Sequence, residues 1–280
     1  MKKVDLHTHS YYSDGLQSPK EVVSICKKEN IYAMSLTDHD GIDGLEEAEK
    51  ECKKQNIEFI PGVEITGIGS EILGYFFDRN NSSLLTLLDK QQKGKVKYIE
   101  KKIEGLKDLN IDIEMEEVIE EAQPGRVLMN PHIARLLVKK RYADNLQEAF
   151  EKYISKVKVR LDTPPPNPKH IIKTIVDAGG LPVLPHPWLL PPFMKEDLEY
   201  LLAKYKRYGL VGIETVGYCP DELLTFDGKN IFDTVKKLAE DHDLIPTGGS
   251  DFHGTKWYKK NIIGECTIDY SVIEKLKKLL

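Results

Sequence analysis

Six of the eight histidines in this chain of 280 residues lie in short segments that also carry acidic residues, proline or glycine. His7 and His9 form a His-x-His pair, and Asp251 and His253 repeat the same spacing much later in the sequence. Side chains two residues apart on an extended segment point to the same face, so both members of each pair can reach one cation. Imidazole combined with carboxylate is the ligand set of zinc, iron or manganese. These residues therefore predict a metal centre.

Further candidates occur in separate segments of the same kind. His39 lies in Thr-Asp-His-Asp, Glu64 ends Gly-Val-Glu, and His132 and His186 each adjoin a proline. Most candidates directly follow a predicted strand, which is where barrel enzymes gather their active-site residues. The complete set of predicted ligands is His7, His9, Asp14, His39, Glu64, His132, His186, Asp251 and His253.

Each candidate taken alone also has an ordinary explanation. A single His132 or His186 is more often a surface or helix-start residue, and Glu64 after a strand could be a surface carboxylate. The joint pattern favours a common site, because ionisable residues end one apolar strand after another. Neighbouring carboxylates such as Asp5 and Asp38 could fix the histidine tautomers by hydrogen bonding. The two histidines without this context, which we predict to be ordinary helix residues, are His170 and His242.

The elements that would position these residues alternate between strands and helices. In the first part of the sequence, strands are predicted at 3–6, 32–36, 59–63 and 72–77. The first helix is expected to begin at Pro19 behind a Ser-x-x-Glu capping box, and the second behind Asp43 as its cap. This alternation predicts parallel strands with covering helices.

The pattern changes between residues 79 and 159, where helical periodicity continues with almost no strand signal. The alternation then resumes, with predicted strands at 181–184, 211–215, 244–247 and 262–267. Seven or eight strands separated by helices are typical of a (β/α) barrel. We therefore predict an α/β fold in which residues 1–78 and 160–280 form one barrel, interrupted by an all-α insertion at 79–159.

The composition disfavours several classes of protein. Acidic residues outnumber basic residues by 45 to 40, which disfavours a protein that coats nucleic acid. The four cysteines are widely spaced, so neither a thiolate zinc site nor a disulfide framework is expected. The motifs GxSxG and GxxxxGKS/T do not occur, which disfavours acyl transfer and a nucleotide-binding phosphate loop. We see no apolar leader and no membrane-spanning stretch, and expect a cytoplasmic protein without a membrane partner.

The motifs resemble, in order and spacing, those of the polymerase and histidinol phosphatase (PHP) superfamily. The segments that carry this resemblance are 5–10, 13–15, 36–40, 62–64, 131–135, 186–187 and 248–254. Within the superfamily, the chain is most similar to a stand-alone subgroup associated with the bacterial tryptophan operon, which hydrolyses nucleoside 3′,5′-bisphosphates and short RNA from the 5′ end. The resemblance covers essentially the whole chain. It implies a distorted (β/α)7 barrel of PHP type with an all-α insertion, and metal-dependent hydrolysis of nucleotide phosphate esters.

The resemblance also implies how two or three divalent ions, whether manganese, zinc or iron, would be held. The first ion is assigned to His7, His9 and Asp251, the second to His132 and His186 with Glu64 as the bridge, and the third to Asp14, His39 and His253. Such cations generate hydroxide near neutral pH and neutralise phosphate oxygens. We expect a hydroxide between the first two ions to attack phosphorus. The expected catalytic residues are Glu64, Asp251 and His253, with His253 or a metal-bound water as the acid.

Two arginines are candidates for binding the substrate phosphate. Arg135 lies one turn after His132, and its guanidinium fork fits phosphate, although a surface arginine on a helix is the alternative explanation. Many members of the superfamily carry arginine two residues before the central histidine, where this chain has Asn130. Arg126 is the second candidate to replace that arginine.

The lysines of the insertion and the identity of the substrate leave alternatives open. The lysines, which form either a solvated helix face or a contact surface for nucleic acid, are Lys90, Lys93, Lys95, Lys97, Lys101, Lys102 and Lys107. The expected partner is a phosphorylated small molecule or nucleotide, extending to short RNA, and no obligate protein partner is evident. The alternative functions are a histidinol-phosphate phosphatase and a non-catalytic, metal-binding or regulatory barrel. The complete ligand set argues against the second alternative.

Overall fold

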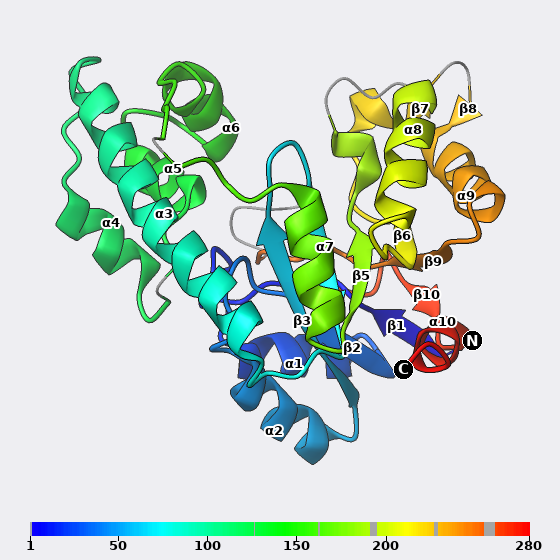
Figure 1. Ribbon diagram of the computed structural model, residues 1–280. Coiled ribbons are helices and arrows are strands. Elements are labelled where there is room, and N and C mark those ends of the chain that lie inside the picture. Colours follow the sequence, from blue (N-terminus) through cyan, green and yellow to red (C-terminus); the bar gives the residue numbers. More distant parts are fainter. Residues whose placement is uncertain (1, 126, 162, 191–194, 227–228, 255–260) are drawn as a thin grey trace.

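The computed structural model describes residues 2–125, 127–161, 163–190, 195–226, 229–254 and 261–280. Its centre is a sheet of eight strands in the order β10-β1-β2-β3-β4-β5-β6-β9, with helices around it (Figure 1). The strands are β1 (Lys3–Asp5), β2 (Ala33–Leu36), β3 (Glu58–Thr66), β4 (Glu71–Tyr75), β5 (Leu181–Leu184), β6 (Gly212–Val216), β9 (Ile245–Gly248) and β10 (Ile268–Asp269).

The sheet curves into a nearly closed barrel because the segments that follow β1 and β9 meet. Thr8 pairs in parallel with Phe252, and the His9 amide donates a hydrogen bond to the Phe252 carbonyl at 2.8 Å. The Asp251 amide donates to the His7 carbonyl, also at 2.8 Å. The predicted barrel is confirmed, and segments from opposite ends of the sequence lie side by side.

The first two helices cover the early strands, as the alternation predicts. Helix α1 (Pro19–Lys28) begins with the expected capping box, in which the Glu21 amide donates to the Ser18 hydroxyl and the Ser18 amide donates to the Glu21 carboxylate. Helix α2 (Leu45–Gln55) is capped by Gly44 without a side-chain hydrogen bond. The prediction of Asp43 as the cap is therefore wrong.

Strand β4 departs from the predicted parallel arrangement. It pairs antiparallel with both β3 and β5, and β10 pairs antiparallel with β1. The physical reason for the reversal at β4 is its short connection, since residues 67–70 can form only a hairpin, whereas a parallel return needs a dozen residues or more. Strand β3 also extends to Thr66, so Glu64 lies inside a strand and not after one.

Helices alone form the region from residue 79 to 159 in the residues that the structure describes. They are α3 (Ser82–Lys107), α4 (Met115–Ala122), α5 (Asn130–Lys139), α6 (Leu146–Ala149) and the π-helix η1 (Phe150–Ile154). Their apolar side chains form a core of their own, which is separate from the clusters of the barrel. Helix α3 belongs to both parts, because Leu84 packs in a barrel cluster and Leu106 in the helical one. The division at residues 78/79 and 159/160 stays a prediction.

The last third of the chain completes the barrel with one difference from the prediction. Its helices are α7 (Pro168–Asp177), α8 (Lys195–Lys206), α9 (Ile231–Asp241) and α10 (Ser271–Lys277), with the 3-10 turns η2 (Pro187–Leu189) and η3 (Asp221–Leu223) and the small hairpin β7 (Thr225–Phe226) and β8 (Lys229–Asn230). The strand predicted at 262–267 is wrong, because this segment forms turns and β10 begins only at Ile268. Gly264, with a φ of +97°, takes a backbone conformation that is incompatible with a strand.

Candidate metal centre

Strand direction brings the candidate residues to one edge of the barrel. Strands β1, β2, β5 and β9 are each followed by a segment that carries candidates, and this edge also receives Glu64 from β3. Because β4 runs in the opposite direction, its first residue, Glu71, reaches the same edge, where it pairs with Thr66. The chain reversal at β4 therefore adds a carboxylate that the sequence motifs did not indicate.

The first group of side chains consists of His7, His9, Glu64 and Asp251, whose ligand atoms lie within 4.8 Å of one another. The Nε2 atom of His7 lies 3.1 Å from Glu64 Oε2 and 3.4 Å from Asp251 Oδ1. The Nε2 atom of His9 lies 3.3 Å and 3.2 Å from the same two oxygens. Both imidazoles of the His-x-His pair thus face the same two carboxylates, as their spacing predicts.

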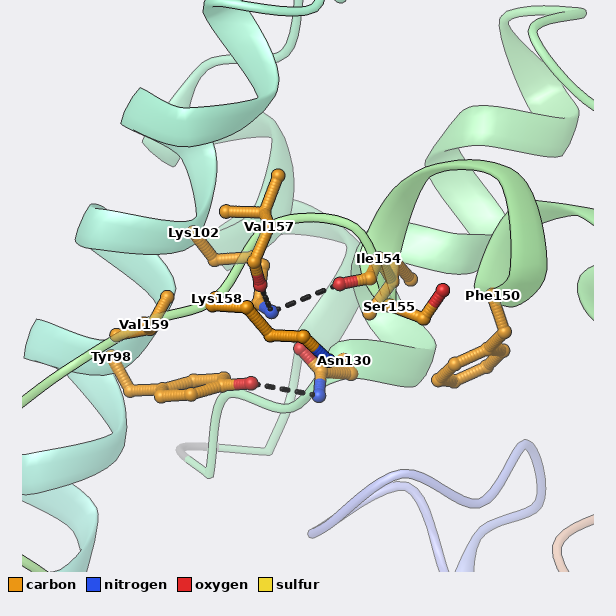
Figure 2. Close-up of a pocket in the computed structure, with 9 residues that line it drawn as sticks. All are labelled: Tyr98, Lys102, Asn130, Phe150, Ile154, Ser155, Val157, Lys158 and Val159. Carbon is orange, nitrogen blue, oxygen red and sulfur yellow. Dashed lines mark hydrogen bonds between the residues drawn. The ribbon is translucent and has the colours of Figure 1, made fainter.

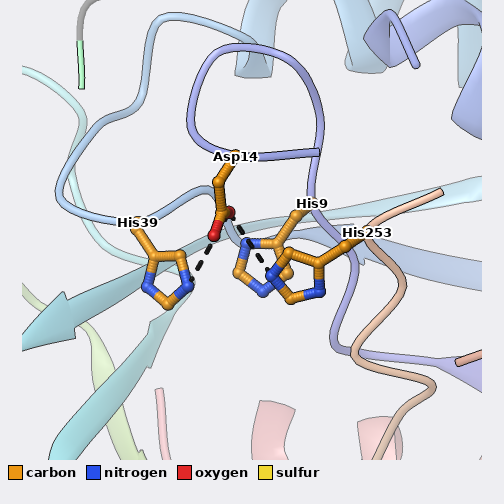
Figure 3. A group of neighbouring side chains, drawn as sticks. All are labelled: His9, Asp14, His39 and His253. Atoms are coloured by element: carbon orange, nitrogen blue, oxygen red, sulfur yellow. Dashed lines mark ion pairs between the residues drawn. The ribbon is translucent and has the colours of Figure 1, made fainter. Parts of the chain in front are cut away.

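A second group shares His9 and adds Asp14, His39 and His253 (Figure 3). Asp14 Oδ1 lies 3.3 Å from His253 Nε2 and 3.9 Å from His39 Nε2. The ring of His9 stacks against those of His253 and His39, with centroid distances of 4.2 Å and 4.5 Å. All four side chains are buried, so a charge placed among them would be shielded from water.

A third group joins His39, Glu64 and Glu71. The Nδ1 atom of His39 lies 3.3 Å from Glu64 Oε2 and 3.6 Å from Glu71 Oε1. His186 adjoins this group, because its Nε2 atom lies 3.0 Å from Glu64 Oε1 and 3.6 Å from Glu71 Oε2. The two oxygens of Glu64 therefore face different imidazoles, which is the geometry that a bridging carboxylate needs.

Hydrogen bonds fix which nitrogen of two rings faces the centre. The Nδ1 atom of His7 lies 3.0 Å from Glu214 Oε1, and the Nδ1–H of His253 donates to the Asp251 carbonyl at 2.8 Å. In both rings Nε2 is then the nitrogen that faces the centre. Glu214 is a buried residue of β6 whose other oxygen accepts from the His186 amide at 2.8 Å. A glutamate inside an otherwise apolar strand was the only sequence signal for this residue.

Asp5 and Asp38 do not orient histidine rings as the sequence suggested. Asp5 Oδ1 accepts from the backbone amides of His7 and Ser250, at 3.2 Å and 2.9 Å. Asp38 accepts from the amide and hydroxyl of Ser10, both at 2.7 Å. These carboxylates hold the loops that carry the candidates, so the expected fixing of tautomers falls to Glu214 instead.

The buried polar atoms of the centre fit divalent cations. Among the described residues, no hydrogen-bond partner exists for either ring nitrogen of His9, for Nδ1 of His39 or for Oδ1 of Asp14, although all these atoms are buried. Leaving such atoms unpaired costs free energy, and a coordinated cation removes that cost. A mixture of imidazole nitrogens and carboxylate oxygens suits manganese, zinc or iron equally.

The electrostatics of the centre also favour cations. Burial lowers the pKa of His9, but the carboxylates of Asp251 and Glu64 outweigh burial and raise this pKa to about 10. Burial and repulsion from Glu64 raise the pKa of Glu71 to about 7. Neighbouring carboxylates contribute to both pKa shifts, and their buried negative charge attracts any positive charge.

Two candidate ligands at this edge have strained backbone conformations. Asp251 has a φ of +52°, and His186 has a φ of +27° with a ψ of +58°, both outside the conformations that residues with a Cβ prefer. Strained backbone of this kind persists where the surrounding contacts determine it, and it clusters at functional sites. The two strained residues are candidate ligands, which is consistent with a functional site at this edge.

Comparisons with known proteins agree with this geometry. A family model described as the PHP domain matches residues 5–159. A 5′-3′ exoribonuclease from Haemophilus influenzae is 31% identical over 262 residues, which cover 90% of each chain. The chain belongs to the PHP domain family. As a member of this family it is a metal-dependent phosphoesterase.

Two further proteins extend the PHP comparison. A 3′,5′-nucleoside bisphosphate phosphatase from Chromobacterium violaceum is 26% identical over 270 residues, or 90% of this chain and 88% of the relative. The structure of a candidate metal-dependent phosphoesterase from Bifidobacterium adolescentis superimposes with a TM-score of 0.84 at 25% identity, covering 98% of this chain and 94% of the other. No helix in the described part of the chain is long and apolar enough to cross a membrane.

His132 stands apart from the PHP metal groups found in the described residues. Its Nδ1 atom accepts a hydrogen bond from the Met129 amide at 3.0 Å, so the remaining proton lies on Nε2, and the ring also bonds the Ser13 backbone. Burial and the Arg135 cation lower its pKa to about 4, which keeps the ring neutral. In this structure His132 joins α5 to the turn that carries Asp14, and its predicted role as a ligand stays a prediction.

Arg135 is a buried residue, and turning its side chain toward a ligand would break its present contacts. Its side chain is 2% exposed, Nε donates to Glu121 Oε1 at 3.0 Å, and Nη1 donates to the Asp14 carbonyl at 2.9 Å. The alternative of a surface arginine is therefore wrong, while binding of phosphate stays a prediction. Arg126 lies outside the described residues.

Three of the seven lysines singled out in the insertion lie in different surroundings. Lys95 reaches the metal edge, where its ammonium lies 2.9 Å from Asp40 Oδ2 and donates to the Thr66 hydroxyl at 3.1 Å. Lys102 is buried in the helical core. Lys93 is an exposed residue paired with Asp89 on the same helix. These three lysines therefore do not form a continuous contact surface for nucleic acid.

Proposed function

We propose that the chain hydrolyses phosphate esters of nucleotides, with nucleoside 3′,5′-bisphosphates or the 5′ end of short RNA as the substrates. The observation that carries the proposal is the convergence of imidazoles and carboxylates from six strands on one edge, with buried ring nitrogens that have no hydrogen-bond partner among the described residues. The two curated relatives described above are named for hydrolysis of RNA and of a nucleoside bisphosphate.

We assign the candidate ligands to this centre in two linked parts. His7, His9 and Asp251 would hold one divalent ion, and Glu64 would bridge it to the His186 side, where Glu71 is available as a further ligand. The second part of the centre is assigned to Asp14, His39 and His253. Bound divalent ions would supply an activated water and neutralise the charge of the phosphate.

The residues of the chain position the ligand side chains and shield the site from water. Glu64 keeps His7 and His186 at fixed separation, because each of its oxygens lies 3.0–3.1 Å from one of their rings. The Nδ1–H of His253 is held by the Asp251 carbonyl, so its Nε2 atom faces Asp14 and would be the atom that holds the ion assigned to this part of the centre. Burial of the group keeps bulk water away from these polar side chains. We also propose that residues 1–78 and 160–280 act as the barrel unit and 79–159 as the insertion.

A turnover screen with added manganese tests the proposal. The panel contains nucleoside 3′,5′-bisphosphate, short 5′-phosphorylated RNA, histidinol phosphate and p-nitrophenyl phosphate. We expect the nucleotide substrates to give the highest kcat/KM. Preference for histidinol phosphate would replace the proposed substrate class, and full activity after removal of metal by chelation would overturn the proposed chemistry.

A further inference from the structure

The helical insertion contains a pocket outside the metal centre. Its volume is about 360 Å³, which is within the range of small-molecule sites. The aromatic rings of Tyr98 and Phe150 line it, and Figure 2 shows Asn130 between them in this view. Ile154, Val157 and Val159 add aliphatic walls, and Lys102, Ser155 and Lys158 add polar groups. Apolar walls with two aromatic rings fit a flat ring system that stacks.

One polar atom in the pocket has no partner. The Nδ2 group of Asn130 donates to the Tyr98 hydroxyl at 3.3 Å, while Asn130 Oδ1 is buried without a hydrogen-bond partner among the described residues. A ligand with an N–H donor on its edge would satisfy this oxygen. A purely apolar ligand would leave it unpaired at a cost in free energy, and a phosphate alone would place negative charge against it.

The walls of the pocket are held firmly in place. The Lys102 ammonium donates to the carbonyls of Ile154 and Val157, at 3.1 Å and 2.6 Å, and lies 5.1 Å from the centre of the Tyr98 ring. Val157 packs against Gly105, where an added Cβ would collide with it. Phe150 begins the π-helix η1, a rare helix type that often marks a functional site. A rigid pocket loses little conformational freedom when it binds a ligand.

The pocket and the metal centre share one support. Helix α5 contributes Asn130 to the pocket wall at its first position, and its next turn bonds the Ser13–Asp14 turn through His132 and Arg135. Lys158 lines the pocket with an exposed ammonium, which suits a ligand that also carries phosphate. Together these contacts describe a site for a ligand that has an aromatic ring with N–H donors and also carries a negatively charged group.

We propose that this pocket binds a nucleobase of the substrate whose phosphate ester is hydrolysed at the metal centre. The inference rests on the proposed function and sharpens it, because it assigns the selection of nucleotides over other phosphate esters to the insertion. Adenine, cytosine and guanine carry an exocyclic amino group that can donate to Asn130 Oδ1, and every base can stack on Tyr98 or Phe150.

Kinetics of pocket variants test the inference. Phe150→Leu keeps an apolar side chain but removes the aromatic face, and Asn130→Ala removes the acceptor. For each variant we expect the ratio of kcat/KM on nucleoside 3′,5′-bisphosphate to kcat/KM on p-nitrophenyl phosphate, which has no base, to fall about tenfold, mainly through KM. Lys156→Ala is the matched control, since Lys156 is an exposed neighbour that does not line the pocket. An unchanged ratio in both variants would overturn the inference.

Binding of adenosine, which has no phosphate, separates the pocket from the chemistry. Saturation-transfer NMR should show contact between the adenine protons and the wild-type protein, and the signal should be lost in Phe150→Leu but kept in Lys156→Ala. If this holds while no phosphate ester is turned over, the pocket binds nucleobases and the proposed function fails. If nucleotides are hydrolysed but adenosine gives the same signal in wild type and Phe150→Leu, the pocket assignment fails and the proposed function stands.

Discussion

The metal edge of the barrel and the core of the insertion are built on opposite principles. The edge gathers buried carboxylates and imidazoles from segments far apart in the sequence, and several of their atoms have no partner in the described chain. The insertion core gathers aliphatic side chains from consecutive helices, for example Ile99, Leu106 and Ile133. The first arrangement needs cations to offset its own charge, whereas the second is stable through burial of apolar surface. A substitution can therefore disrupt the metal edge or the insertion core without disrupting the other.

The largest effect is expected at the metal edge. His9→Ala or Glu64→Ala should reduce phosphoesterase turnover on the order of 10³-fold or more, because each residue belongs to two of the groups that surround the centre. Bound metal, measured by elemental analysis, should fall in parallel while the helical core stays folded by circular dichroism. His170→Ala is the control, since His170 is an exposed histidine of α7. Normal metal content in His9→Ala would refute the assignment.

The next effect tests the connection between the two regions. Lys95→Met removes the cation that pairs with the fully buried Asp40, and breaking a buried pair from one side costs about 3–5 kcal/mol of unfolding free energy. Denaturant titration measures this loss. Lys93→Met, on the same helix but exposed, should change stability by less than about 0.5 kcal/mol. Equal losses of unfolding free energy in the two variants would mean that the Lys95–Asp40 pair does not stabilise the protein.

A cavity in the insertion core should destabilise the protein and leave the metal edge intact. Leu106 is fully buried, so Leu106→Ala should cost about 2–5 kcal/mol of unfolding free energy. Leu85→Ala, at an exposed position of the same helix, is the matched control. Metal content should be the same in both variants under native conditions. A loss of metal in Leu106→Ala would show that the two regions are not independent.

The smallest effect is expected from a local helix signal. Ser18→Ala removes the hydroxyl that accepts from the Glu21 amide at the start of α1, which should cost about 1 kcal/mol. Thermal unfolding detects this as a small decrease in Tm with unchanged turnover. Ser24→Ala, an exposed serine on the same helix, provides the comparison. A loss of stability larger than that of Leu106→Ala would contradict the expectation that this effect is the smallest.

The sequence predicted the parts of the centre that lie in short motifs. The His-x-His pair, the Asp251–His253 pair and His186 directly follow strands of the barrel, and Glu64 lies inside β3 near its end, so all of them meet at one edge. Glu71 and Glu214 were missed, since each is a single acidic residue in a strand and shows no local pattern. Their positions depend on the direction of β4 and on the pairing of β6, which only the folded chain determines.

His132 shows the opposite limit of sequence reasoning. Its motif places it with the ligands, which stays a prediction, while the Met129 amide uses Nδ1 of its ring, a local contact that cannot be inferred from residue type. The barrel itself was predictable because strand and helix periodicities alternate over most of the chain. The reversal of β4 and the turns at 262–267 were not, because both depend on connection length and on one glycine conformation.

The pairing of Thr8 with Phe252 has a consequence for the order in which the protein is made. During synthesis His7 and His9 leave the ribosome early, but Asp251 and His253 follow only after nearly all other barrel strands. Until then the growing chain has the imidazole pair without Asp251, one of the two carboxylates that face it in the folded protein. The group of His7, His9, Glu64 and Asp251 is therefore completed only when the barrel closes.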